Sequence, residues 1–143
     1  MHNIGLRSAL LGFCCVTAVS LAWPVQAEVV NLKAAMNASS EVPPNPSKGT
    51  GTLTATYDTT TKKLSWKGSY TGLTGPATAA HFHAGDPGKN GGVVVPITPA
   101  TSPLDGSATL TDAQAADLLA GKWYVNVHTE ANKGGEIRGQ VTK

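Results

Sequence analysis

Cysteine is almost absent from this sequence. The 143 residues include two cysteines, Cys14 and Cys15, which are adjacent in an apolar N-terminal segment. The rest of the chain therefore has neither a disulfide framework nor a thiolate cage for a structural metal. Charge is also sparse: 14% of residues are charged, with 11 Lys+Arg against 9 Asp+Glu and no basic stripe. This pattern predicts no nucleic-acid-binding surface.

Long hydrophobic runs are lacking outside the first 27 residues. Arg7 precedes a mostly apolar, uncharged run over residues 9–23, and Val25-Gln26-Ala27 has the small-x-small form of a cleavage site. The run is short for a bilayer span, and no second one follows. We predict a signal peptide over residues 1–27, a mature domain over 28–143 without a membrane span, and a periplasmic or secreted location. An uncleaved N-terminal anchor is the alternative.

The predicted mature domain is rich in Thr, Gly, Ala and Val, a composition typical of β-proteins. Apolar and polar residues alternate over residues 51–57 and 64–70, which predicts a hairpin. Thr111 and Gln114 form a capping box before a short helix, which Gly121 ends. About eight strands are expected, over residues 29–36, 51–57, 64–70, 78–84, 93–97, 107–110, 123–128 and 136–141. Together they predict an all-β fold, an antiparallel sandwich or barrel with one short helix.

The histidines are few and concentrated. His2 lies in the predicted leader, and the other three are His81, His83 and His128. Because side chains alternate along a strand, His81 and His83 share one face, while Phe82 between them takes the core side. By the same alternation, Val127 takes the core side of its strand and His128 the opposite face. All three imidazoles are therefore expected to face away from the core, where they can meet if the two strands are neighbours.

Three imidazoles without a thiolate favour an open metal site. Such a site suits copper, as Cu(I) or Cu(II), or less favourably a catalytic zinc with bound water. Met36 is the only methionine after residue 27, and its soft thioether is a candidate fourth ligand; a core methionine is the alternative. Carboxylates near the histidines are candidates to hold their second ring nitrogens, with solvated turn positions as the alternative: Asp86, Glu130 and Glu136. Three surface histidines that bind nothing are the alternative to the whole site.

Several motifs resemble those of the chordin-type (CHRD) domain family, and they span nearly all of the mature chain. They are Glu41-Val42-Pro43-Pro44, Leu73-Thr74-Gly75-Pro76, Ala79-Ala80-His81-Phe82-His83-Ala84-Gly85, Val93-Val94-Val95-Pro96, Leu110-Thr111-Asp112-Ala113-Gln114, Leu118-Leu119-Ala120-Gly121, Tyr124-Val125-Asn126-Val127-His128-Thr129 and Gly134-Gly135-Glu136-Ile137-Arg138-Gly139-Gln140. The resemblance implies a small secreted bacterial protein; in animals such domains occur within a secreted antagonist of growth factors.

The architecture of this family is similar to that of Cu/Zn superoxide dismutase, which implies a Greek-key β-sandwich. The resemblance implies copper positions for His81 and His83, with His128 as a third. No histidine remains to bridge to a zinc site, and Arg138 is either an anion-guiding or a structural residue. We therefore expect an exported copper-binding protein that buffers copper or delivers it to another copper-handling protein. The alternatives are a copper redox enzyme of the dismutase type and an extracytoplasmic protein-interaction module.

Overall fold

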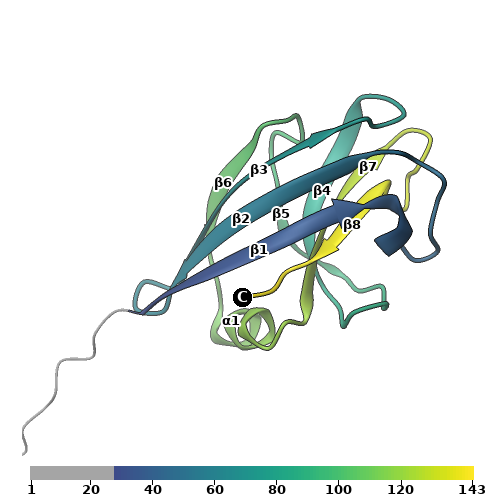
Figure 1. Cartoon of the computed structure of the whole chain (residues 1–143). Helices are drawn as coiled ribbons and strands as arrows, with labels where there is room; N and C mark the ends of the chain where they lie inside the picture. The colour runs from purple at the N-terminus through teal and green to yellow at the C-terminus, as the bar shows by residue number, and fades with distance from the viewer. Residues whose placement is uncertain (1–27) are drawn as a thin grey trace, which may run out of the picture.

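The computed structural model describes residues 28–143 (Figure 1). The predicted signal peptide, residues 1–27, lies outside the described residues. Eight strands, one α-helix and a short 3₁₀-helix (η1, Ala38–Ser40) make up the fold. The other elements are β1 (Val29–Asn37), β2 (Thr50–Asp58), β3 (Lys63–Thr71), β4 (Ala77–Ala84), β5 (Val93–Pro96), β6 (Leu104–Thr109), α1 (Asp112–Leu119), β7 (Trp123–Thr129) and β8 (Ile137–Gln140). The all-β prediction with one short helix is confirmed.

All strand pairs are antiparallel, and they form one sheet in the order β5-β4-β7-β8-β1-β2-β3-β6. The sheet curls into a nearly closed barrel with β5 and β6 as its two edges (Figure 1). After β6 the chain passes through α1, and β7 returns to pair with β4. Such a return beside an earlier strand is a Greek-key connection. It brings two segments more than 40 residues apart side by side, His81 opposite Asn126.

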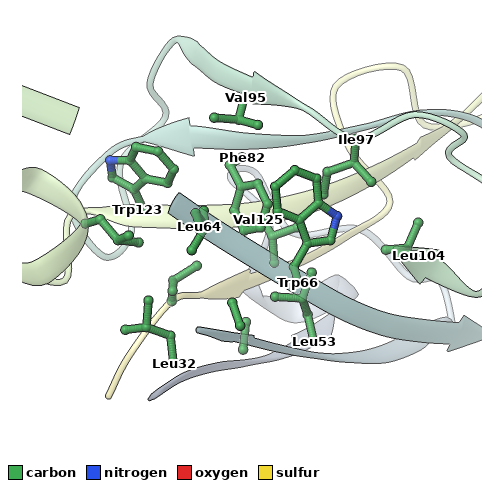
Figure 2. Packing of buried hydrophobic residues seen from close by; sticks show 14 of the residues in the cluster. Leu32, Leu53, Leu64, Trp66, Phe82, Val95, Ile97, Leu104, Trp123 and Val125 are labelled. Carbon is green, nitrogen blue, oxygen red and sulfur yellow. The ribbon is translucent and has the colours of Figure 1, made fainter. Parts of the chain in front are cut away.

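The inside of the barrel holds the hydrophobic core (Figure 2). Alternation explains it, because on β1 Leu32, Ala34 and Met36 are buried while the residues between them are exposed. The ring of Phe82 is fully buried and contacts two indoles edge-on or tilted, with centroids 5.2 Å from Trp66 and 5.9 Å from Trp123. These aromatic contacts join β3, β4 and β7 across the barrel.

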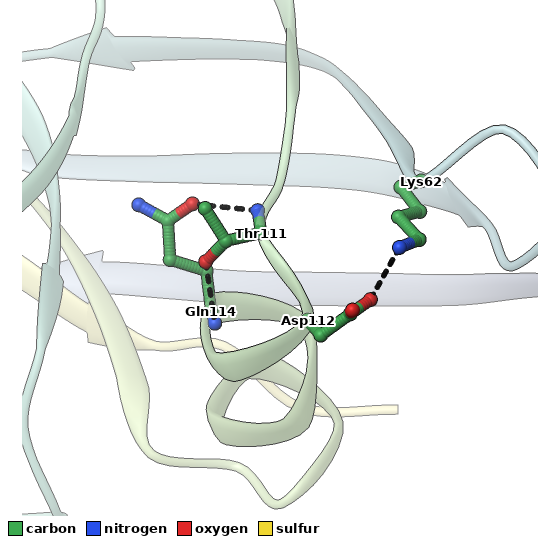
Figure 3. A network of polar contacts seen from close by, with 4 residues as sticks. All are labelled: Lys62, Thr111, Asp112 and Gln114. Atoms are coloured by element: carbon green, nitrogen blue, oxygen red, sulfur yellow. Dashed lines mark hydrogen bonds and ion pairs between the residues drawn. The ribbon is translucent and has the colours of Figure 1, made fainter.

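The helix α1 lies at one end of the barrel, near the C-terminus (Figure 1). Its capping box forms as predicted: the Gln114 backbone N–H donates to Thr111 Oγ1 at 3.2 Å, and Thr111 N–H donates to Gln114 Oε1 at 2.9 Å (Figure 3). An exposed ion pair joins Lys62 Nζ to Asp112 Oδ1 at 2.5 Å. Gly121, with a φ of 74°, follows the C-cap. No helix within residues 28–143 is long and apolar enough to cross a bilayer.

Two strands, β6 and β5, can be compared in detail with the ranges expected from the sequence. The strand expected to start at residue 107 begins at Leu104, which is fully buried and pairs with Gly68. The sequence pattern does not predict this start, because a single core leucine surrounded by a proline and polar residues shows no apolar–polar alternation. The apolar run at residues 93–97 contains β5, which is an edge strand; Pro96 is tolerated there although proline cannot donate to a ladder.

Candidate metal centre

The pairing of β4 with β7 creates the candidate site on the outer side of the barrel wall. On β4, Ala80 and Phe82 enter the core, so His81 and His83 face outward. On β7 the odd-numbered residues 123, 125 and 127 enter the core, which leaves His128 on the outer side. The register of the two strands places Ala79 opposite His128, so His128 lies two residues along β4 from His81. The three imidazoles therefore gather on the same side of two neighbouring strands, as predicted.

The three rings converge closely enough to share one ion. One ligand nitrogen from each of His81, His83 and His128 lies within 4.8 Å of the other two. His81 Nδ1 is 3.2 Å from His128 Nε2. The site is sheltered, because His83 and His128 are only 8% and 9% exposed, while His81 is partly open to solvent. His81 is therefore the most accessible of the three rings.

Backbone carbonyls fix the second nitrogen of two rings. His83 Nδ1 donates to the carbonyl of Gly91 at 2.9 Å, and His128 Nδ1 donates to the carbonyl of Lys133 at 2.9 Å. Since a carbonyl only accepts, these bonds select the tautomer in which Nε2 carries the lone pair. Metal-binding histidines commonly have such a partner, which orients the ring. Both Nε2 atoms are therefore ready to coordinate.

The surroundings also disfavour protonation of His81 and His83. Desolvation lowers the pKa of His81, and the charges of His128 and His83 lower it further. Desolvation lowers the pKa of His83 as well, against the opposing effect of its hydrogen bonds to Gly91 and Asn126. A metal ligand must be the neutral imidazole. The two rings are therefore available to an ion at a lower pH than an ordinary histidine.

A stack of planar groups holds His83 in place. The rings of His83 and Tyr124 are parallel, with centroids 4.7 Å apart, and the guanidinium of Arg138 lies 3.5 Å over the other face of Tyr124. Arg138 is buried and donates to the Lys89 carbonyl at 2.7 Å and to Asn90 Oδ1 at 3.2 Å. The arginine thus ties the loop before β5 to the sheet, which makes it a structural residue.

Comparison with known protein families now adds to this geometry. Residues 32–141 match the CHRD domain, which is most of the chain. The chain belongs to the CHRD domain family. No curated protein and no solved structure matches it. The motifs noted in the sequence therefore identified the family, and the histidine cluster can be assigned to a CHRD domain.

Within this CHRD domain, Met36 lies apart from the histidines. It is 2% exposed, and its side chain faces the core on β1, where its ε-methyl lies against Gly51 of β2. The histidines are on the outer side of the wall formed by β4 and β7. The core alternative describes this residue, and the site is built from the imidazoles without the thioether.

None of the three candidate carboxylates bonds to a ring nitrogen in the part of the chain that the structure describes, and backbone carbonyls take the Nδ1 hydrogens of His83 and His128 instead. Asp86 is exposed, and Glu130 is exposed and pairs with Lys133 at 2.8 Å. Glu136 is fully buried, but its oxygens accept hydrogen bonds from Thr74 and Thr129. A carbonyl at the right place depends on the path of a loop, which sequence spacing does not define.

Asn126 is the residue of the CHRD site that was missed. Its Oδ1 lies 3.0 Å from His83 Nε2 and 2.9 Å from His128 Nε2. Alternation along β7 already placed it on the face of His128, which is the signal that could have found it. Glu41, from the loop after η1, lies behind it and is buried. Desolvation raises the pKa of Glu41 to about 7, although Arg138 and the Asn126 amide act to lower it.

Proposed function

We propose that this CHRD domain is an exported copper-binding protein that buffers copper or hands it to another copper-handling protein. The observation that carries the proposal is the convergence of the His81, His83 and His128 donors to within 4.8 Å of one another. Export is supported by the apolar N-terminal segment and the cleavage motif that ends at Ala27.

Copper is favoured by the chemistry of the donors. Imidazole nitrogen binds both copper and zinc, but divalent copper forms the more stable complex with a given set of nitrogen and oxygen donors. A structural zinc site usually closes with four protein ligands, often thiolates. The residues after position 27 contain no cysteine, and the three histidines leave coordination positions open.

Buffering or delivery is favoured by the access to the site. Two of the rings are nearly buried and held by carbonyls, whereas His81 is partly exposed. An incoming donor from a partner protein can therefore approach the ion from the side of His81 while His83 and His128 still hold it. Stepwise ligand exchange of this kind moves an ion without releasing it to water.

Metal titration tests the proposal. The protein is produced from the full-length sequence, purified without an affinity tag, analysed for bound metal and titrated with Cu(II) and Cu(I). We expect binding of one copper ion, and a loss of affinity of more than about 100-fold in His83→Ala, since losing a ligand should exceed the 10–100-fold effect of losing its partner. Thr78→Ala, an exposed residue of the same strand, is the control. Equal copper affinity in His83→Ala and the wild type would defeat the proposal.

A further inference from the structure

The side-chain oxygen of Asn126 lies next to two of the rings of the proposed copper site. It contacts the Nε2 atoms of both His83 and His128, at 3.0 and 2.9 Å. Asn126 is 2% exposed, so no bulk water competes for these contacts. An amide in this place either bonds to the rings or joins them in binding an ion.

Counting protons separates these two roles. His83 and His128 each use their Nδ1 hydrogen on a backbone carbonyl. In neutral rings both Nε2 atoms then carry lone pairs, and Asn126 Oδ1 is a third acceptor facing them. Acceptors this close together need a donor hydrogen or a cation among them. A metal ion bound by both Nε2 atoms and Oδ1 satisfies all three acceptors together.

The distances between these atoms agree with a coordination shell. Two ligands about 2.0–2.1 Å from one ion, at angles from right-angled to tetrahedral, are roughly 2.9–3.4 Å apart. The Asn126 Oδ1 separations of 3.0 and 2.9 Å and the 3.2 Å between His81 Nδ1 and His128 Nε2 lie in this range. The oxygen is therefore placed as a fourth donor beside three nitrogens.

Glu41 and Gly135 lie at the Nδ2 end of the Asn126 amide. The buried Glu41 carboxyl and Asn126 Nδ2 are both next to Gly135, on the side of the amide away from the rings that Oδ1 contacts. Gly135 has a φ of 129°, and a Cβ there would lie 2.8 Å from Asn126 Nδ2 and clash with Glu41 Oε1. The space above the amide is thus kept free for the carboxyl, and Oδ1 is left to face the rings.

We propose that Asn126 Oδ1 is the fourth donor of the site and that it makes the site selective for Cu(II) over Cu(I). This inference rests on the proposed copper-binding function. Mixed nitrogen and oxygen donors suit Cu(II), whereas Cu(I) prefers soft sulfur ligands.

The test measures Cu(II) and Cu(I) affinity separately, by competition with chelators, together with the electron paramagnetic resonance spectrum of the Cu(II) form. The full-length protein is compared with Asn126→Ala, the isosteric Asn126→Asp, and Asn31→Ala, an exposed asparagine on β1, as the control. We expect Asn126→Ala to lower Cu(II) affinity roughly 10–100-fold and to change the Cu(II) hyperfine coupling, with Cu(I) affinity altered less than about threefold. Asn126→Asp should raise Cu(II) affinity, because a carboxylate is the stronger donor.

The outcomes distinguish this inference from the function on which it rests. Wild-type Cu(II) affinity and spectrum in Asn126→Ala, with His83→Ala still impaired, would overturn the fourth donor and leave copper binding intact. Equal losses for Cu(I) and Cu(II) would also overturn it, since they indicate a structural role. If Asn126→Ala does not fold, unchanged Cu(II) affinity in Asn126→Asp would also overturn the fourth donor. A wild-type protein that binds no copper would overturn both proposals.

Discussion

At the scale of the residue, Glu136 shows how a buried charge can be stabilised without a cation. Its side chain accepts hydrogen bonds from Ser47 at 2.5 Å, from Thr74 at 2.7 Å and from Thr129 at 2.5 Å. Desolvation alone would raise its pKa, but these bonds together lower the pKa to about 2. The carboxylate thereby joins the loop before β2, the loop before β4 and the end of β7.

The pKa of Glu136 predicts how stability depends on pH. An ordinary glutamate has a pKa of 4.5, so the contribution of Glu136 is fully present above pH 4.5 and is lost as the pH falls toward 2. The shift corresponds to about 3 kcal/mol. In Glu136→Gln we expect the free energy of unfolding at pH 7 to fall by about 2–3 kcal/mol and its acid dependence to flatten.

Urea unfolding at pH 7 and pH 3 measures both effects. Glu130→Gln is the control, because Glu130 is exposed and pairs only with the exposed Lys133. Equal unfolding free energies for Glu136→Gln and the wild type at pH 7 would show that the hydrogen bonds do not outweigh desolvation.

The histidines show how much of the site the sequence predicts. Alternation around Phe82 and Val127 was enough to place His81, His83 and His128 on one outer face, because strand geometry has a period of two. Alternation did not predict the hydrogen-bond partners of the rings. These are the backbone carbonyls of Gly91 and Lys133, whose positions depend on how the loops fold. Because every residue has a backbone carbonyl, the sequence does not show which one will contact a ring.

At the scale of the element, the loop before β5 is held tightly at one glycine. A Cβ on Gly91 would clash with the carbonyl oxygen of Ala84, whereas a Cβ on the adjacent Gly92 would meet nothing within 4 Å. The Gly91 carbonyl also accepts the Nδ1 hydrogen of His83, at 2.9 Å. We predict that Gly91→Ala displaces this carbonyl and lowers copper affinity about 10–100-fold, the usual effect of losing the partner of a ligand.

Gly92→Ala is the matched control for this prediction and should bind copper like the wild type. Copper titration and the thermal midpoint are measured for both variants. Wild-type affinity in Gly91→Ala would mean that the orientation of His83 does not depend on this loop.

The cap of α1 supplies a second prediction at this scale. The Thr111 hydroxyl accepts from the Gln114 N–H, so Thr111→Ala should reduce the free energy of unfolding by about 1 kcal/mol. Thr111→Ser keeps the oxygen and should lose little. Chemical denaturation of both variants measures the difference. A serine variant as unstable as the alanine variant would assign the effect to the lost methyl group instead.

The strands themselves were predictable, but one pairing was not. Local alternation and turn residues located the strands within a few residues, because both depend on neighbours in sequence. The union of β4 with β7 depends on the Greek-key return after α1, and more than 40 residues separate His81 from its partner Asn126. Only the packing of the whole barrel, with Phe82 between Trp66 and Trp123, determines that return.

At the scale of the whole molecule, protection should fall from β7 toward the edges of the sheet. Every residue of β7 is buried, and the strand pairs with β4 on one side and β8 on the other. β5 and β6 each lack a neighbour on one side. Since edge strands open more readily than core strands, amide hydrogen exchange should be slowest in β7 and faster in β5. Equal protection of β5 and β7 would mean that the barrel opens as a single unit.

The two faces of β7 have a consequence for how this protein can change over generations. Successive side chains of the strand belong in turn to the hydrophobic interior and to the proposed metal site, with Val125 and Val127 on one side and Asn126 and His128 on the other. Losing or gaining a single codon within it would exchange these roles for every residue beyond the change. Substitutions on one face of β7 can therefore occur independently of substitutions on the other face. Inserting or deleting one residue within β7 would instead disrupt the hydrophobic core and the proposed metal site together.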